Sequence, residues 1–259
     1  MINFYNGDCM DFMRGKPDGF YDLAVVDPPY GGGGIPSAMG RTDSAEGLTN
    51  MELPHPQIVT NHIAGGGDEQ GTTSCTSMKV ARTGGTWARK YNPQGGVFDD
   101  ASPNIKFWDY APPKEYFDEL FRVSKNQIIW GGNYFSLPPC RCFLIWRKLT
   151  ISEKFTMAMA EYAWTSFNAN SKVFEAAPQG NASEPRFHPT QKPVKLYKWC
   201  ISMFAEKGWK LLDTHGGSMS SAVAAHELGC DMDICEVNDF YFRKGRERVE
   251  KAMRQPMLL

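Results

Sequence analysis

The sequence predicts an α/β protein whose mostly parallel sheet is covered by helices on both faces. Apolar runs typical of strands alternate with helix-like segments at both ends of the chain, which is the pattern of such folds. The chain has 259 residues, of which 42% are hydrophobic, and this is enough for one large core. We therefore expect a single domain over 1–259 that is interrupted by one insertion.

The N-terminal segment predicts a strand, a short helix and a second strand. The expected strands cover 2–5 and 21–26, and the expected helix covers 8–14. Residues 23–26 are all apolar, which indicates a strand that is buried on both faces of a sheet.

The C-terminal segment resumes the alternation at Pro113, because proline favours the first turn of a helix. From Tyr116 to Val123 the large apolar side chains recur on one helical face. The other elements follow from apolar runs and the turn residues between them. They are strands over 127–130, 142–146, 157–165, 209–212 and 232–235, and helices over 193–206, 219–228 and 240–253.

Residues 31–106 differ in composition from both flanking segments. They hold 14 of the 25 glycines and few large aliphatic residues, so they bury too little apolar surface to offset the entropy of an ordered backbone. We expect a long mobile insertion here, either a passive linker or a functional loop. Its cations favour the functional loop, since no acid lies among Lys79, Arg82, Arg89 and Lys90.

Charge and hydropathy exclude several classes of protein. Lys+Arg total 28 and Asp+Glu total 29, so the net charge of −1 excludes a chain-wide polycation. The apolar runs are far shorter than the roughly 18 residues of a membrane helix, and the N-terminus lacks a basic-then-apolar signal. We expect a cytoplasmic protein without membrane contact. The seven cysteines include no Cys-x-x-Cys pair, so we expect no metal site.

The tetrapeptide Asp27-Pro28-Pro29-Tyr30 directly follows the buried strand over 23–26. Ligands of open α/β sheets bind beyond the carboxyl ends of the strands, so chemistry is expected here. The two prolines restrict the backbone and leave the carbonyls of Asp27 and Pro28 with few local partners. A carboxylate and a carbonyl can accept both N–H groups of a planar amino group while its ring stacks on Tyr30.

A second turn follows the strand over 209–212, where Asp213-Thr214-His215-Gly216-Gly217-Ser218 leads into a helix. Glycines let the backbone approach a ligand closely at a helix N-terminus. Glu236 lies 19 residues after Gly217, close to the spacing of about 20 at which dinucleotide-type sites place an acid on ribose. The two features together predict a ribose-bearing ligand. The full Gly-x-Gly-x-x-Gly pattern of nicotinamide dehydrogenases is absent.

A third motif, His188-Pro189-Thr190-Gln191-Lys192-Pro193, precedes an expected helix. It combines a restrained turn with hydroxyl and amide groups and a cation that can meet a carboxylate.

Together with Asn6-Gly7-Asp8-Cys9, these motifs resemble the amino-group DNA methyltransferases. The resemblance is to the permuted class, in which Asp-Pro-Pro-Tyr precedes the S-adenosylmethionine motif in the chain. It covers residues 1–30 and about 110–253, and leaves the insertion over 31–106 uncovered. Members of the family usually have a glycine where Met219 stands, so this side chain is expected to crowd the cofactor.

The resemblance implies a Rossmann-like sheet of seven strands, S-adenosylmethionine as methyl donor, and methylation of adenine N6 in double-stranded DNA. It places Asp27, Pro28, Pro29 and Tyr30 at the target base. It places His215, Gly216, Gly217 and Ser218 beside the methionine part of the donor, and Lys192 and Pro193 near its carboxylate. Glu236 would hold the ribose, Asp8 would lie by the adenine, and Asp213 belongs to the same cofactor motif.

The electronics of an aromatic amine define the mechanism expected of these residues. The lone pair of adenine N6 is delocalised into the ring, so hydrogen bonds to Asp27 and Pro28 must direct that nitrogen toward tetrahedral geometry. The nitrogen then attacks the sulfonium methyl in line. The target base must first be flipped out of the duplex, at a cost of a few kcal/mol that stacking on Tyr30 partly offsets.

DNA contact is predicted by the local charge distribution. Between Arg141 and Lys198 there are nine Lys/Arg and four Asp/Glu, in the region where this class carries target recognition, and 141–190 is the candidate recognition region. Arg141, Arg147 and Lys148 are the expected phosphate contacts there, together with the four cations of the insertion.

Several alternatives stay open at this point. Cytosine N4 is also an exocyclic amino group, and Met219 allows a non-catalytic DNA-binding relative. An RNA methyltransferase is a further alternative. The sequence leaves a homodimer open, and any restriction nuclease of a restriction-modification pair would be a separate chain.

Overall fold

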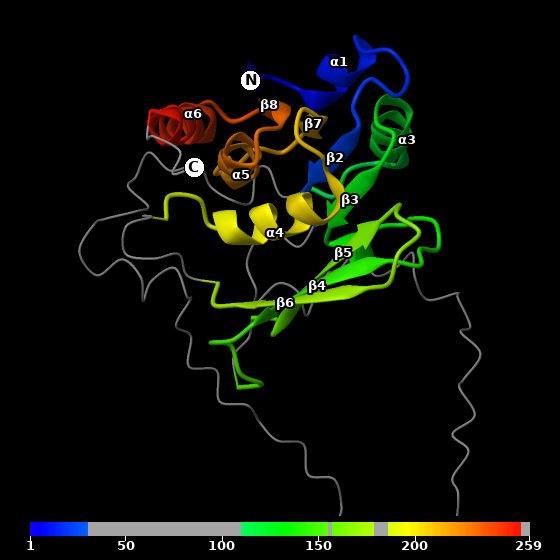
Figure 1. Ribbon diagram of the computed structural model, residues 1–259, viewed down its shortest axis with the longest axis vertical. Coiled ribbons are helices and arrows are strands. Elements are labelled where there is room, and N and C mark those ends of the chain that lie inside the picture. The colour runs from blue at the N-terminus through cyan, green and yellow to red at the C-terminus, as the bar shows by residue number, and fades with distance from the viewer. Residues whose placement is uncertain (31–109, 155–156, 179–185, 255–259) are drawn as a thin grey trace, which may run out of the picture. The chain divides into compact units, whose positions relative to one another are not determined.

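The computed structural model describes residues 1–30, 110–154, 157–178 and 186–254 (Figure 1). All of these residues belong to one unit. The insertion expected over 31–106 lies outside the described residues, and so do its four cations.

One sheet of eight strands organises the unit, and its spatial order is β1-β8-β7-β2-β3-β5-β4-β6. Every neighbouring pair is parallel except the two pairs made by β5, which runs antiparallel to β3 and β4. The mostly parallel α/β class predicted from the sequence is therefore confirmed. The strands are β1 (Ile2–Asn6), β2 (Leu23–Val26), β3 (Gln127–Trp130), β4 (Phe143–Lys148), β5 (Ala160–Thr165), β6 (Lys172–Ala176), β7 (Lys210–Asp213) and β8 (Asp231–Glu236).

Two helical layers cover the sheet, one on each face, as Figure 1 shows. Met13 and Leu120 bring α1 (Cys9–Arg14) and α3 (Lys114–Val123) into one apolar core with one face of the sheet. On the other face, Leu196, Ala222 and Val249 join a second core. They come from α4 (Val194–Phe204), α5 (Ser220–Glu227) and α6 (Asp239–Met253).

The eighth strand corrects the expectation of seven. β6 is the edge strand beside β4, and the sequence did not predict it. Its residues Lys172, Val173 and Glu175 are exposed, so the strand presents no apolar face that a periodicity argument could detect. Within the described part of the chain, no helix has the length and apolar character needed to cross a bilayer.

Candidate active site

The motifs predicted from the sequence meet at one edge of the sheet. Asp27 follows β2, Gly131 follows β3, Thr214 follows β7 and Val237 follows β8. These four strands are mutually parallel, so their carboxyl ends lie at the same edge. This is the edge at which open α/β sheets bind ligands.

Tyr30 turns back onto Asp27 after the two prolines. Its hydroxyl donates a hydrogen bond of 2.8 Å to Asp27 Oδ1. The ring lies directly on Gly131, where a Cβ atom would stand only 2.1 Å from Tyr30 Cε1. Gly131 also has a φ of +70°, so both its backbone conformation and its contact with Tyr30 require glycine.

A second aromatic side chain covers the Tyr30 ring. Tyr134 belongs to a short 3-10 helix, η3 (Gly132–Tyr134), and its ring is stacked on Tyr30 with centroids 4.8 Å apart and planes 18° apart. Tyr134 is 46% exposed, so it can move without disturbing the core.

Lys192 joins Asp27 through a buried ion pair. Its Nζ atom donates to Asp27 Oδ2 at 2.5 Å and to the Tyr30 hydroxyl at 3.2 Å. Asp27 therefore has one oxygen bonded to Tyr30 and the other to Lys192. A carboxylate offers about four lone-pair sites, so acceptor capacity remains on both oxygens.

The ion pair continues through two further residues. Glu161 Oε2 lies 3.1 Å from Lys192 Nζ, and Glu161 Oε1 lies 2.5 Å from Lys148 Nζ. We call Asp27, Lys192, Glu161 and Lys148 the charge row, because negative and positive groups alternate along it. Glu161 was not singled out from the sequence, since nothing in its local pattern indicates that it contacts Lys192.

The structure corrects the expectation that Lys148 contacts DNA phosphates. This residue is 6% exposed and its ammonium group is bound to Glu161, so it is not a surface cation. Its side chain shares a strand face with buried Trp146, two residues earlier in β4, which explains why it points inward.

Electrostatics keep the inner members of the charge row ionised. Burial alone raises the pKa of Glu161, but the ammonium groups of Lys192 and Lys148 outweigh it and lower that pKa to about 2. Burial likewise opposes the charge of Lys192, and the carboxylates of Asp27 and Glu161 hold its pKa above the ordinary value. Each buried charge is thus matched by an opposite neighbour.

Two carboxyl groups hold the turn that follows β7. Asp213 Oδ1 accepts from the His215 amide at 3.0 Å, and Asp213 Oδ2 accepts from the Ser221 hydroxyl at 2.5 Å. Burial outweighs these bonds and raises the pKa of Asp213 to about 7. Glu236 Oε2 accepts from the Gly217 amide at 2.7 Å, so the end of β8 is tied to the turn.

The geometry favours glycine at two positions of that turn. Gly217 has a φ of +49°, and a Cβ atom on Gly216 would lie 3.1 Å from the Cys235 carbonyl oxygen. The backbone therefore packs closely against β8, next to Glu236.

Met219 has a φ of +57°, and it is the one non-glycine residue with a left-handed φ among the residues described. It is fully buried. A Cβ atom on Gly245 of α6 would lie 2.6 Å from Met219 Cγ and 2.9 Å from its sulfur atom. The methionine side chain, expected from the sequence to crowd the cofactor, thus packs into the space that Gly245 leaves on α6.

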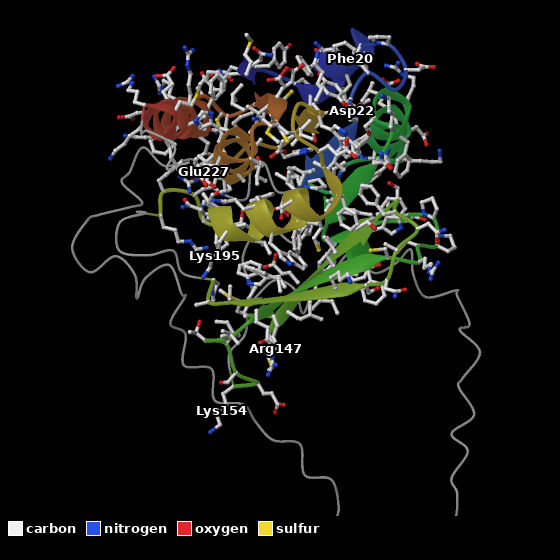
Figure 2. The ribbon with its side chains drawn as sticks, in the orientation of Figure 1. Phe20, Asp22, Arg147, Lys154, Lys195 and Glu227 are labelled. Atoms are coloured by element: carbon white, nitrogen blue, oxygen red, sulfur yellow. The ribbon has the colours of Figure 1, made fainter. Side chains whose placement is uncertain are left out.

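The other site residues predicted from the sequence make local contacts within their own or a neighbouring element. Asp8 caps α1, since its Oδ1 accepts from the Met10 amide at 2.7 Å, and Pro193 is the N-cap residue of α4. Arg147 pairs with Glu175 at 2.7 Å in an exposed position and projects from the β4–β6 side (Figure 2). His215 Nδ1 lies 2.9 Å from the Thr214 hydroxyl oxygen.

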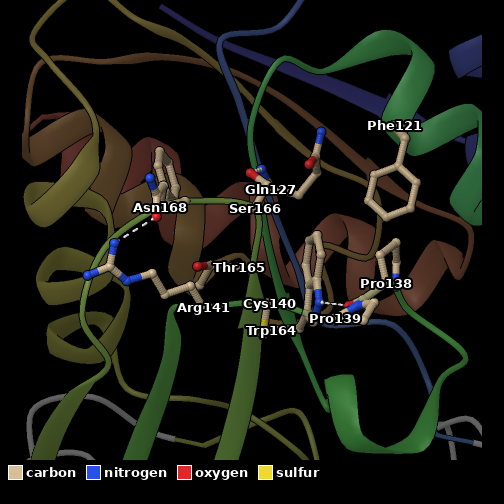
Figure 3. A pocket seen from close by; sticks show the side chains of 11 residues that line it. Phe121, Gln127, Pro138, Pro139, Cys140, Arg141, Trp164, Thr165, Ser166 and Asn168 are labelled. Carbon is tan, nitrogen blue, oxygen red and sulfur yellow. Dashed lines mark hydrogen bonds between the residues drawn. The ribbon is translucent and has the colours of Figure 1, made fainter.

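Arg141 lies at the opposite edge of the sheet from Asp27. It bonds Asn168 at 3.0 Å beside a cavity of about 340 Å³, which Figure 3 shows. The cavity lining includes Gln127, which begins β3, and Thr165, which ends the antiparallel β5. Both positions are at the edge remote from Asp27, so Arg141 does not join the charge row. No group of three or more metal-ligating side chains is found in the described part of the chain.

Comparison with known proteins finds one matching family model and several similar solved structures. Residues 108–247 match the model of a family described as DNA methylase, N6_N4_Mtase. No curated protein matches the chain.

Three of the similar solved structures have low sequence identity to this chain. The M1.HpyAVI–SAM complex is 14% identical over 96% of this chain and 100% of that one, with a TM-score of 0.49. A putative DNA modification methylase from Thermus thermophilus, complexed with S-adenosyl-L-methionine, is 13% identical over 99% and 98%, with a TM-score of 0.48. PvuII DNA methyltransferase, described as cytosine-N4-specific, is 11% identical over 97% and 91%, with a TM-score of 0.49.

Proposed function

The chain belongs to the N6_N4_Mtase family of DNA methylases, and from that premise we propose that it methylates adenine N6 in double-stranded DNA. The methyl donor in this proposal is S-adenosylmethionine. The observation that carries the proposal is the geometry of Asp27, whose two oxygens are held by Tyr30 and Lys192 at the carboxyl edge of the sheet.

The residues around the second turn suit this donor. The backbone of Gly216 and Gly217 approaches β8 closely. The carboxyl group of Glu236, which accepts from the Gly217 and Asn238 amides, is the proposed acceptor for the ribose hydroxyl groups. When bound, the donor supplies a methyl group on a positively charged sulfur atom. Asp213, Ser218, His215, Pro193 and Asp8 belong to the same proposed donor site. Lys192, which the resemblance places near the donor carboxylate, donates to Asp27 and Tyr30 and is proposed to hold Asp27 instead.

Asp27 and the Pro28 carbonyl are proposed to accept the two N–H groups of the target amino group. Their bonds would localise the nitrogen lone pair, which is otherwise delocalised into the base and poorly nucleophilic. The ammonium group of Lys192 donates to Asp27 Oδ2 at 2.5 Å and so fixes the direction of that carboxylate oxygen. The main role of Asp27 is therefore to orient the nitrogen and to stabilise positive charge on it.

Tyr30 is the proposed stacking surface for the flipped base. Tyr134 now covers that ring, and its exposed position lets it move aside when the base enters. The base then replaces one aromatic contact by another, which offsets part of the cost of unstacking it from the duplex.

Product analysis tests this function directly. The chain is incubated with unmethylated duplex DNA and labelled S-adenosylmethionine, and the DNA is digested to nucleosides. N6-methyldeoxyadenosine supports the proposal, whereas N4-methyldeoxycytidine would select the alternative specificity. Absence of both products, with the donor bound, would instead favour a non-catalytic DNA-binding protein.

Two controls sharpen the result. Asp27→Asn keeps the shape of the side chain and removes its charge, so it separates catalysis from binding. Single-stranded RNA is added as a competitor, since preferential methylation of RNA would contradict a DNA substrate.

A further inference from the structure

Glu161 belongs to the charge row but is not one of the residues proposed to contact the donor or the target base. It comes from β5, whose antiparallel direction brings the beginning of that strand to the edge where β2 and β3 end. Its two oxygens face two different lysines, Lys192 at 3.1 Å and Lys148 at 2.5 Å. The ion pairs that connect Glu161 with Asp27 therefore run through Lys192.

Because these four groups are largely buried, each of their charges is unfavourable unless an opposite charge lies beside it. The side chains of Lys192 and Lys148 are each 5% exposed, that of Asp27 is 15% exposed and that of Glu161 is 22% exposed. Two buried ammonium groups require two carboxylates nearby, because an unpaired buried charge is strongly unfavourable. With all four groups ionised, the charge row is neutral.

We propose that Glu161 is a positioning residue for methyl transfer, which holds Lys192 in place so that Lys192 can hold the Asp27 carboxylate toward the target amino group. Lys148 in turn fixes Glu161. This inference rests on the proposed function of Asp27 as the acceptor for the target base.

Three oxygen atoms surround the Lys192 ammonium group, and one of them is Glu161 Oε2, which forms an ion pair with it at 3.1 Å. The others belong to Asp27 and Tyr30, the two groups proposed to contact the base. Without the Glu161 carboxylate, Lys192 loses the neighbour on the side away from the base, and its four-carbon stem can adopt other rotamers. Asp27 would then lose a defined direction for its second oxygen.

The protonation of Lys192 depends on the same contact. Burial favours its neutral form, and the two carboxylates keep it charged. Titratable and charged groups face this cluster from every element packed around it. They are Asp27 and Tyr30 after β2, Lys148 in β4, Glu161 in β5, His188 before α4, Tyr197 in α4 and Asp213 at the end of β7.

Glu161→Gln is the test variant, and Glu175→Gln is its matched control. Glu175 is also a carboxylate in this sheet with a cation 2.7 Å away, but its ion pair with Arg147 is exposed and does not belong to the charge row. Glu161→Gln should lower kcat roughly tenfold to a hundredfold, the effect of small misplacement of a reacting group, while KM for DNA changes little. Glu175→Gln should match the wild-type chain.

The pH profile separates positioning from a general structural effect. Removing an opposite charge near Lys192 lowers its pKa, so the alkaline limb of the kcat profile should move to lower pH by roughly 1 unit or more. The same titration can be followed without activity by NMR of 13C-labelled lysine, with Lys192→Arg to assign the resonance. An alkaline limb and an amine titration that both coincide with those of the wild-type chain would overturn the inference.

A second variant guards against loss of folding. Glu161→Gln leaves Lys148 without its counter-ion, whereas Lys148→Met combined with Glu161→Gln keeps the row neutral. The double variant should fold and still show the low Lys192 titration and the reduced kcat; a wild-type titration there would also overturn the inference. An inactive wild-type chain would refute the proposed function instead, and the NMR titration would still decide whether Glu161 controls Lys192.

Discussion

Replacing Met219 by glycine should destabilise the protein, although it removes a strained backbone conformation. Met219 has a φ of +57°, a conformation that costs a non-glycine residue about 1–2 kcal/mol. Its side chain is also fully buried, and truncating a buried methionine typically costs about 2–5 kcal/mol. The difference between the two ranges is roughly 0–4 kcal/mol, so Met219→Gly should lower the free energy of unfolding by about 2 kcal/mol, the middle of that range.

Gly245, the glycine of α6 against which Met219 packs, makes the prediction more specific. In the wild-type chain, Gly245→Ala places a Cβ atom 2.6 Å from Met219 Cγ, an overpacking that costs about 1–3 kcal/mol. In the Met219→Gly background that atom is gone, and alanine gains about 1 kcal/mol over glycine inside a helix. The new Cβ atom also lies 3.2 Å from the Gly217 carbonyl oxygen in either background. Gly245→Ala should therefore destabilise the wild-type chain more than it destabilises the Met219→Gly chain.

Urea denaturation of the four chains measures this coupling as a double-mutant cycle. Additive effects of the two substitutions would refute the packing of Met219 against Gly245. A Met219→Gly chain more stable than wild type would show that backbone strain, and not burial, dominates at this position.

The other predictions concern the donor, the target base, DNA and pH. Asp27→Asn should abolish methyl transfer and leave donor affinity within about threefold of wild type, because the amide cannot stabilise the developing positive charge; calorimetry that shows lost donor binding would contradict this role. Glu236→Ala should weaken donor affinity by roughly 1–3 kcal/mol, the cost of unpaired buried polar groups, and an unchanged affinity would exclude a ribose contact. Burial, with the charges of Arg186 and Lys192, lowers the pKa of His188 to about 3, so its contribution to stability is present above its unfolded pKa and is lost as pH falls. Between about pH 7 and about pH 5 this loss should amount to about 2 kcal/mol, and His188→Gln should reduce the acid sensitivity by that amount in denaturation experiments. Replacing the four cations of the insertion with Gln should flatten the log–log salt slope of DNA affinity by about two to four units without altering the methylated site; an unchanged slope would show that they do not contact DNA. These cations are Lys79, Arg82, Arg89 and Lys90.

The sequence predicted the parts of the fold that carry strong local signals. Strand β3 was predicted with its observed bounds, and α1, α3, α4, α5 and α6 lie within two residues of the expected ends. These elements combine continuous apolar runs or one-sided apolar faces with turn residues at their ends. The edge strand β6 lacks both signals, and only its pairing with β4 defines it.

The charge row shows why part of the site could not be predicted. The position of Asp27 follows from a local rule, because it comes directly after a buried strand. The contact of Lys192 with Glu161 depends on the direction of β5, and no local pattern shows that this strand runs against its neighbours. Lys148 was placed on the surface for the same reason, since its burial depends on a carboxylate that is 13 residues away in the sequence.

The ion pair between Lys148 and Glu161 also joins the end of β4 to the start of β5. Lys148 ends β4 and Glu161 is the second residue of β5, so their side chains close the base of the segment that links these two strands. The Lys148 amide adds a backbone bond of 2.8 Å to the Met159 carbonyl at the same place. The same ion pairs that join the end of β4 to the start of β5 thus continue through Lys192 to the Asp27 carboxylate.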